Sequence, residues 1–457
     1  MDVYVYTKVD NLNQNKIVAI TMIAILLVAG LCSAVVLLRD NDDGHKASVT
    51  GNLKVMGNAN NDDYIDEHDV DLLKELSGND WDKEKYPYAD ANNDGVIDSK
   101  DVDVVESIIA GTNCTLYYYD IYDELTSVNY PVKHDRIGVS YWQQAELTAV
   151  LGVWNKVVLA STSTTDSNSH RYDTSNVDKS FKGSKITSEL ILETDCDLVI
   201  ASQGKSDVVG AAIEVDPTIT PYYVDVSKSS TYISTVLTLG VLINENQKAQ
   251  DYAKYVYSIK EKLEDGMSKV TEKADVVITL MYANQSTRAN IVVECEGTGA
   301  ADMIGMIANV YDSSSKSSSD NRLNVEKDWF IQNCGTAFDY IIIQQEGTDT
   351  KKVNDTYYTP AMYNERFEEA IAYFSDTTAY SEGKILGTTF SYNSFGGYAN
   401  LLYLAYLLYP DVFSEDDGWD ALQDYFNDFT TATIDVRTQG GWYYTGTAYV
   451  QYNQRLH

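Results

Sequence analysis

The chain has 457 residues, 44% of them hydrophobic and 22% charged, so it is long enough to bury large cores in two or three domains. Its 34 basic and 68 acidic residues give a formal net charge of -34, which repels phosphate backbones and argues against nucleic acid as a partner. Only five histidines are present, which disfavours a zinc enzyme built on clustered imidazoles.

An uncharged apolar run lies near the start of the chain, from Ile17 to Leu38. As a helix its 22 residues would be about 33 Å long, enough to cross a bilayer. We therefore predict a short cytoplasmic tail at 1–16, a transmembrane helix at 17–38 and a linker at 39–51. A cleaved signal peptide is the alternative, but the run is longer than usual and no small-x-small cleavage site follows it.

A duplicated loop motif follows the linker. Oxygen-bearing side chains recur at positions 1, 3, 5, 9 and 12 of two loops that begin 32 residues apart, and this spacing suits a loop wrapped around one Ca²⁺ with the position-7 carbonyl as a further ligand. The predicted ligands are Asn58, Asn60, Asp62, Tyr64, Asp66 and Asp69 in the first loop, and Asp90, Asn92, Asp94, Val96, Asp98 and Asp101 in the second. Position 6 is Gly95 in the second loop but Asp63 in the first, so we expect the first site to be weaker.

Each loop leads into an amphipathic pattern, starting at Val70 and Val102, that ends near a glycine, as a helix would. Paired loops with Asp at position 12 and one helix each resemble the dockerin domains, over residues 52–111. The resemblance implies two Ca²⁺ ions that fold the domain and a cohesin-like partner read by positions 10 and 11. Those positions are Glu67-His68 and Ser99-Lys100; because the pairs differ, an intramolecular spacer role is also open.

Calcium is millimolar outside cells, so calcium loops favour placing residues 39–457 outside, on a protein that crosses the cell membrane once. After a predicted linker at 112–132, short apolar strands alternate with helices, a pattern typical of α/β units. We predict a first lobe at 133–243, a connecting helix at 244–273, and a second lobe with C-terminal helices and an aromatic tail at 274–457. The fold class is thus α/β: two α/β lobes joined by a long helix, preceded by a small all-α calcium-loop domain and the transmembrane helix.

The order of lobe, long helix and lobe resembles the extracytoplasmic substrate-binding proteins of ABC importers for ferric siderophores, haem and cobalamin. The positions that match are Arg136-Ile137, Glu146, Leu151-Gly152, Val157-Val158, Glu189, Asp197 to Ala201 and Leu239-Gly240. Cys196 and Ala337 stand where that family usually has proline. The resemblance implies an ABC permease as partner, a metal chelate as cargo rather than cofactor, and Glu146 as a surface carboxylate that docks to the permease.

Ligands of open α/β sheets lie at the carboxyl ends of the strands, which selects the candidate binding residues. They are Tyr141, Trp142, Ser161, Ser202, Gln203 and Lys205 in the first lobe, and Tyr282, Asn284, Glu294, Glu296, Gln344 and Glu346 in the second. Aromatic rings would provide flat faces for a macrocycle, and amides would bind its rim. A bare transition metal is disfavoured because few histidines lie in this region.

No enzyme motif of the G-x-S-x-G, Walker or H-E-x-x-H type is present, so we expect a binding protein and not an enzyme. The favoured function is a membrane-anchored extracellular substrate-binding protein of an ABC importer, which captures a metal chelate with small lobe closure. The alternative is a calcium-dependent cell-surface adhesion or assembly protein that binds a cohesin-like partner. A carbohydrate binder that uses the aromatic tail around Trp442 is a third possibility.

Overall fold

The computed structural model describes residues 39–40, 46–47, 50–167, 171–226, 228–281, 290–317, 320–345, 352–353, 356–357, 371–388, 391–439, 442–445 and 448–449. The predicted tail and transmembrane helix at 1–38 lie outside these residues. Among the residues that are described, no helix is both long and apolar enough to cross a membrane.

The calcium-loop segment forms two short helices, α2 (Glu67–Leu76) and α3 (Ser99–Ala110), as predicted. Each begins at an aspartate N-cap, Asp66 or Asp98, in a reciprocal capping box with the aspartate three residues later. The α3 helix ends at Gly111 in the left-handed conformation, whereas α2 ends one residue before the expected glycine, at Ser77. Before this segment, β1 (Arg39–Asp40) pairs with β2 (Lys46–Ala47) in the predicted linker.

The region predicted as a second linker is a β-hairpin, so that prediction is wrong. Strands β3 (Cys114–Tyr119) and β4 (Leu125–Tyr130) pair antiparallel along their whole length. The hairpin has a buried face because Leu116 and Tyr118 alternate with more exposed residues, and the Tyr118 ring lies 6.2 Å from that of Tyr222. This alternation of apolar and polar residues was the signal for strands that the sequence prediction missed.

The first lobe is a five-stranded parallel sheet in the order β7-β6-β5-β8-β9. Its strands are β5 (Ile137–Val139), β6 (Val157–Ser161), β7 (Lys179–Phe181), β8 (Leu198–Ala201) and β9 (Thr220–Tyr223). Its helices are α4 (Trp142–Val150), α5 (Ser188–Glu193), α6 (Ser206–Val215) and α7 (Tyr232–Leu242), with short turns η1 (Trp154–Lys156), η2 (Ser163–Ser167), η3 (Gln203–Lys205) and η4 (Ser229–Thr231). The predicted alternation of short apolar strands with helices is confirmed in this lobe.

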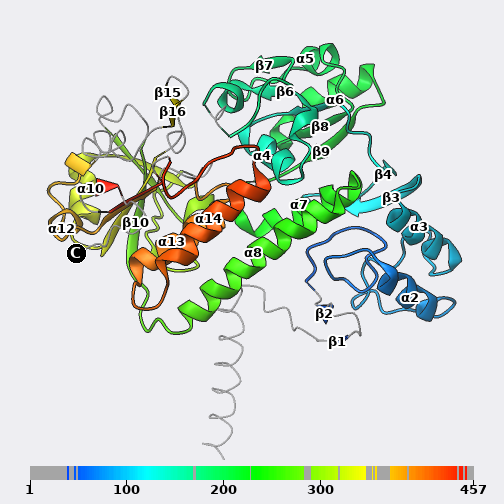
Figure 1. Ribbon diagram of the computed structural model, residues 1–457, viewed down its shortest axis with the longest axis horizontal. Coiled ribbons are helices and arrows are strands. Elements are labelled where there is room, and N and C mark those ends of the chain that lie inside the picture. Colours follow the sequence, from blue (N-terminus) through cyan, green and yellow to red (C-terminus); the bar gives the residue numbers. More distant parts are fainter. Residues whose placement is uncertain are drawn as a thin grey trace, which may run out of the picture.

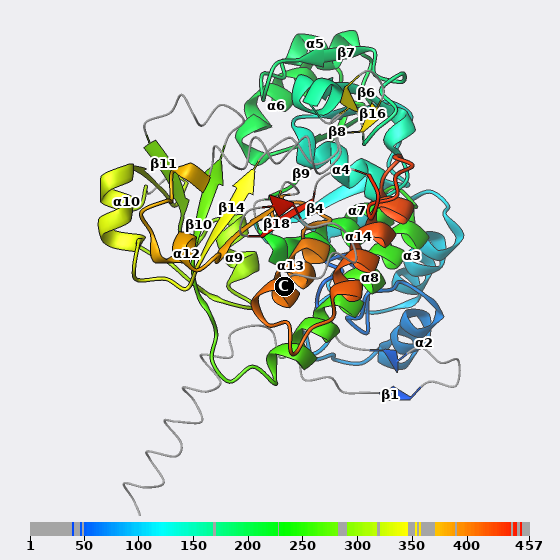
Figure 2. The same ribbon diagram turned by 60° about the vertical axis from the view of Figure 1, so that its left-hand side comes forward.

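The connecting helix is confirmed as α8 (Asn246–Met267), which spans 22 residues and runs beneath both lobes (Figure 1). It buries Ala249, Tyr252, Ala253, Val256, Ile259 and Leu263, the apolar stripe expected from the sequence. Helices α13 (Gly397–Leu408) and α14 (Glu415–Phe429), from the C-terminal part of the chain, lie beside it (Figure 2).

The second lobe is a mixed sheet in the order β13-β11-β10-β14-β17-β18-β19, with β12 also on β10. Strands β10, β12, β14 and β17 are parallel, while β11, β13 and β18 run antiparallel to their neighbours. The strands are β10 (Asp275–Met281), β11 (Asn290–Glu294), β12 (Asn309–Val310), β13 (Arg322–Glu326), β14 (Tyr340–Gln345), β17 (Ile385–Thr388), β18 (Tyr443–Thr445) and β19 (Ala448–Tyr449), and β15 (Lys352–Val353) pairs with β16 (Thr356–Tyr357). The remaining helices are α9 (Gly299–Ile304), α10 (Lys327–Cys334) and α12 (Thr378–Ser381).

The aromatic tail completes the core of the second lobe. Tyr443 stacks on Tyr403 of α13 with ring centroids 3.8 Å apart, and Trp442 is 1% exposed. Because Trp442 is buried, it cannot stack on a polysaccharide, and the carbohydrate hypothesis is wrong in that form.

One hydrophobic core runs through most of the molecule. It contains Leu53, Val55 and Ile108 of the calcium-loop segment together with residues of lobe 1, α8, α13 and α14. The segment is therefore packed against the two lobes and the connecting helix through a shared core.

Candidate functional site

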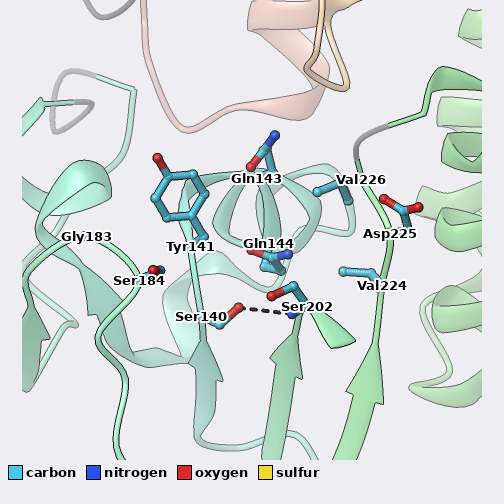
Figure 3. Close-up of a pocket in the computed structure, with 10 residues that line it drawn as sticks. All are labelled: Ser140, Tyr141, Gln143, Gln144, Gly183, Ser184, Ser202, Val224, Asp225 and Val226. Carbon is cyan, nitrogen blue, oxygen red and sulfur yellow. Dashed lines mark hydrogen bonds between the residues drawn. The ribbon is translucent and has the colours of Figure 1, made fainter. Parts of the chain in front are cut away.

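A cavity of about 520 Å³ lies in the first lobe, at the edge of the sheet where parallel strands end. Figure 3 shows the strand arrows pointing at the cavity, with side chains from the loops that follow them around it. Its lining consists of Ser140, Tyr141, Gln143, Gln144, Gly183, Ser184, Ser202, Val224, Asp225 and Val226. This is the edge at which open α/β sheets bind ligands.

The strand ends determine how these side chains are placed. Ser140 follows β5, and its hydroxyl oxygen accepts a hydrogen bond from the Ser202 amide, which follows β8, at 3.1 Å. This bond joins the ends of two neighbouring strands beneath the cavity (Figure 3). Tyr141 is the N-cap residue of α4, no side chain caps that helix, and its first residues line the cavity. The start of α4 can therefore donate backbone hydrogen bonds to a ligand oxygen.

The lining is polar but carries little charge. Three serine hydroxyls, two glutamine amides and the Tyr141 phenol contribute hydrogen-bonding groups, and two valines contribute apolar surface. Among these ten lining residues, Asp225 is the one with a charged side chain. Such a wall can bind a bulky polar ligand by hydrogen bonds and by contact with an aromatic face.

Comparison with known proteins agrees with this geometry. A family model described as "Periplasmic binding protein" matches residues 137–385, more than half of the chain. This chain belongs to the periplasmic binding protein family. It is a solute-binding protein and not an enzyme, as predicted. No curated protein sequence matches it.

Solved structures of periplasmic binding proteins share its fold. A TroA-like periplasmic binding protein FepB from Veillonella parvula is 13% identical, with a TM-score of 0.58, covering 72% of this chain and 99% of that one. A periplasmic solute binding protein from Veillonella parvula DSM 2008 is 15% identical, with a TM-score of 0.52, and the match covers 72% of this chain and 97% of that one. Helicobacter pylori Ceue with Ni(II) bound is 14% identical, with a TM-score of 0.50, covering 70% and 97%.

Two of the six predicted ligand residues of the first lobe line the cavity, Tyr141 and Ser202. Trp142 opens α4 beside Tyr141, with ring centroids 6.2 Å apart, but is not in the lining. Ser161 is fully buried and its hydroxyl binds Ser163 Oγ at 2.8 Å and the Gly183 carbonyl. Gln203 and Lys205 form turn η3 and are likewise outside the lining.

The prediction missed the segment after β9. That strand ends at Tyr223, so Val224, Asp225 and Val226 form a loop at the ligand edge. A hydrophilic break at Asp225 within an apolar run was the available signal. Gln143 and Gln144 were also missed, because they lie within α4 and not in a loop directly after a strand.

Of the predicted residues of the second lobe, the three that the structure describes do not all lie at one edge of the sheet. Because β11 runs antiparallel to β10, Glu294 pairs with Ile278 in the middle of β10, and the chain continues from there toward Glu296 away from the carboxyl end of β10, where Leu280 pairs with Gln344. Glu294 is buried and accepts hydrogen bonds from the Arg322 guanidinium at 2.9 and 3.1 Å, which is a structural ion pair. Gln344 is buried at the end of β14 and accepts from the Tyr392 amide at 3.4 Å. Tyr282, Asn284 and Glu346 lie outside the described residues.

Glu146 cannot be a surface docking residue, so that prediction is wrong. Its side chain is 1% exposed, because α4 packs against α14 and α8. One carboxylate oxygen accepts from the Phe395 amide at 3.2 Å and the other from the Tyr425 hydroxyl at 2.5 Å. Burial raises the pKa of Glu146, while the nearby charge of Arg171 and these hydrogen bonds oppose the shift. The residue joins the first lobe to the C-terminal helices.

The two predicted calcium loops have nearly the same hydrogen-bond geometry. The amides of Asn60 and Asn92 each donate to the position-12 aspartate at 3.1 Å, and the amides of Asp66 and Asp98 donate to its other oxygen at 2.9 and 2.8 Å. Asn61 and Asn93 both adopt the left-handed conformation, with φ of 58° and 55°. The repeat seen in the sequence is therefore a structural duplication.

The first loop meets one test of a cation site. Asn58, at position 1, is fully buried, and its Oδ1 atom has no hydrogen-bond partner. Burial, with smaller repulsion from neighbouring aspartates, raises the pKa of Asp62 to about 6 and that of Asp69 well above its ordinary value, and a cation would relieve both effects. Over the described ranges, however, no three His, Cys, Asp or Glu side chains form a group that could hold a metal. In this structure Asp66 and Asp98 instead cap helices.

Proposed function

We propose that this chain is a membrane-anchored, extracellular substrate-binding protein of an ABC importer, which captures a metal chelate of the ferric siderophore, haem or cobalamin class and delivers it to a permease. The observation that carries the proposal is the polar cavity at the carboxyl ends of β5, β8 and β9, in a chain of the periplasmic binding protein family.

The chemistry of the cavity supports a chelate as the ligand. In a chelate, donor atoms already surround the metal, so the protein needs only to bind the organic periphery. Serine hydroxyls and glutamine amides can bind carbonyl or hydroxyl groups of that periphery, and Tyr141 presents an aromatic face to it. A bare transition metal would instead require converging imidazoles or carboxylates, and Asp225 alone supplies a carboxylate in this lining.

Calcium binding by both loops is part of the proposal, with the same ligand set as predicted from the sequence. It is supported by the duplicated loop geometry and by the unpartnered oxygen of Asn58. In this role Ca²⁺ supplies a positive charge that offsets the repulsion between the loop carboxylates. Anchoring by residues 17–38 would keep the binding protein at high local concentration beside its permease.

The test is a thermal-shift screen of the full chain in millimolar calcium against ferric hydroxamates, ferric catecholates, haem, cobalamin and free metal ions. A ligand present at 100 times its Kd should stabilise the protein by about 2.7 kcal/mol. Tyr141→Ala should weaken binding of the active class about tenfold, equivalent to about 1.4 kcal/mol of lost contact. Tyr122→Ala is the matched control, because Tyr122 is 52% exposed in the β3–β4 turn.

A shift with one chelate class that Tyr141→Ala reduces and Tyr122→Ala does not would support the proposal. No shift with any compound except calcium would contradict it, and would favour the calcium-dependent assembly protein. That second function draws support from Ser99 and Lys100, the partner-reading positions of the second loop, which are exposed. A cohesin-like domain added in calcium would then form a complex.

A further inference from the structure

The first predicted calcium loop is attached to the connecting helix at one residue, Asp63, through both its side chain and its main-chain carbonyl. This residue is 5% exposed, and its carboxylate accepts hydrogen bonds from the Tyr257 hydroxyl of α8 and from the Thr50 hydroxyl. Asn52 adds a further bond, donating from its amide to the Tyr257 hydroxyl oxygen at 2.8 Å. The main-chain carbonyl of Asp63 also accepts a hydrogen bond from the side-chain amide of Gln250, which lies on the same face of α8 as Tyr257.

The same position in the second loop is different. Gly95 has φ of +91°, nothing lies within 4 Å of where its Cβ would be, and the neighbouring Asn93, Asp94 and Val96 are exposed. Asp63, by contrast, does not adopt a positive φ, so it carries a side chain without the strain expected from the sequence. An aspartate in place of the usual glycine is thus explained by contact with α8, and the two loops are not equivalent.

A second contact between the module at 52–111 and the rest of the chain lies at the end of α3. The Tyr130 hydroxyl donates to the Ile108 carbonyl at 2.9 Å and lies 3.0 Å from Asn244 Oδ1, just before α8. Gly111 lies against Asn244, where a Cβ would come within 2.9 Å of its Nδ2 atom. The end of α3 is therefore held through its backbone carbonyl and by packing at Gly111, whereas the first loop is held in addition through a side chain of its own, that of Asp63.

We propose that the first loop is an intramolecular clamp: when it binds calcium, it holds Asp63 in place and so fixes the middle of α8, the helix that connects the two lobes. The second loop, whose surface is open, does not take part. Calcium thereby acts on the solute-binding body through the chain's own contact at Asp63 and Tyr257. This inference rests on the proposed calcium binding and is separate from the identity of the solute.

Hydrogen–deuterium exchange of the full chain, with millimolar calcium or with a calcium chelator, tests the clamp. In the wild type, calcium should slow amide exchange in the first loop and also in the central turns of α8, by about tenfold or more. Tyr257→Phe removes the hydroxyl that α8 contributes, and Asp63→Gly installs the residue found in the second loop. Both variants should keep calcium protection of the loop and lose it in α8.

Two variants serve as controls. Tyr255→Phe removes a hydroxyl on the same helix that donates instead to the Ala421 carbonyl of α14 at 3.1 Å, and should leave the response of α8 unchanged. Asp94→Ala disables the second loop and should also leave it unchanged. Isothermal titration with calcium is done in parallel. If calcium binds and exchange in α8 does not change, the clamp is refuted while calcium binding stands. The same conclusion follows if Asp94→Ala, and not Asp63→Gly, abolishes the response of α8. If no calcium binds, both the clamp and the proposed calcium binding are refuted.

Discussion

At the scale of single residues, Glu146 is the clearest case of a carboxylate whose environment determines its role. It lies between lobe 1 and the C-terminal helices and accepts hydrogen bonds from Phe395 and Tyr425. Because burial raises its pKa, the folded state binds the proton more tightly than the unfolded state does. The contribution of Glu146 to stability is therefore greatest below the unfolded pKa and falls as pH rises through the folded pKa.

Glu146→Gln keeps the shape and removes the titration. We expect the stability of this variant relative to the wild type to increase as pH rises from about 4 to about 8. Urea unfolding at several pH values measures the difference. Glu146→Ala leaves the buried hydrogen-bond donors and the charge of Arg171 uncompensated and should cost about 3–5 kcal/mol near neutral pH. A flat difference between glutamine variant and wild type across this range would contradict the assignment.

Residue identity was easier to predict than residue environment. Both Glu146 and Asp63 were noticed in the sequence, one as a surface carboxylate and one as a poor turn residue. Each is instead buried against an element distant in sequence, α14 for Glu146 and α8 for Asp63. Local spacing cannot show such contacts, because they depend on how helices pack across more than 190 intervening residues.

At the scale of elements, the crossing of α13 and α14 depends on a glycine. A Cβ added at Gly418 of α14 would lie 2.7 to 2.8 Å from the Cβ and Cα atoms of Tyr403 on α13. Alanine is the better helix former by about 1 kcal/mol. Here the close approach should outweigh that gain, because the clash includes backbone that cannot move without separating the helices. We expect Gly418→Ala to destabilise the protein by about 1–3 kcal/mol.

The matched control is Gly210→Ala, also within a helix. Gly210 lies in α6, and no atom lies within 4 Å of the position of its added Cβ. This variant should be about 0.5–1 kcal/mol more stable than the wild type. Chemical denaturation of the two variants side by side measures both effects. Equal changes of the same sign would show that helix propensity alone acts and that the crossing is not tight.

Elements with a strong local pattern were predicted well. The strands of lobe 1 are short apolar runs, and α8 has a long apolar stripe, so periodicity was sufficient. Strand direction in lobe 2 was not available from such patterns, because a strand with a given alternation of apolar residues can pair with its neighbour in either direction. The reversed direction of β11 places Glu294 beside the middle of β10 and leads the chain toward Glu296 away from the predicted ligand edge.

At the scale of the whole molecule, the loop–helix module at 52–111 and the two lobes share one packed core. Their shared core includes Val55, which is fully buried and forms a backbone bridge to Tyr118 of the hairpin, and the hairpin in turn packs on lobe 1. The composition alone indicated several domains, and the sequence boundaries at 52–111 and 133–243 suggested separable ones. The buried face of the hairpin at 114–130 is what joins them.

A substitution in the module should therefore be felt by the entire chain. Val55→Ala removes two buried methyl groups and leaves a cavity, at a cost of about 2 kcal/mol. In calcium, we expect scanning calorimetry to show the main unfolding transition of the chain shifted to lower temperature as a whole, since the core that is damaged is common to the module, lobe 1 and α8. An independent module would give another result: a small early transition that moves alone while the main transition stays where it was.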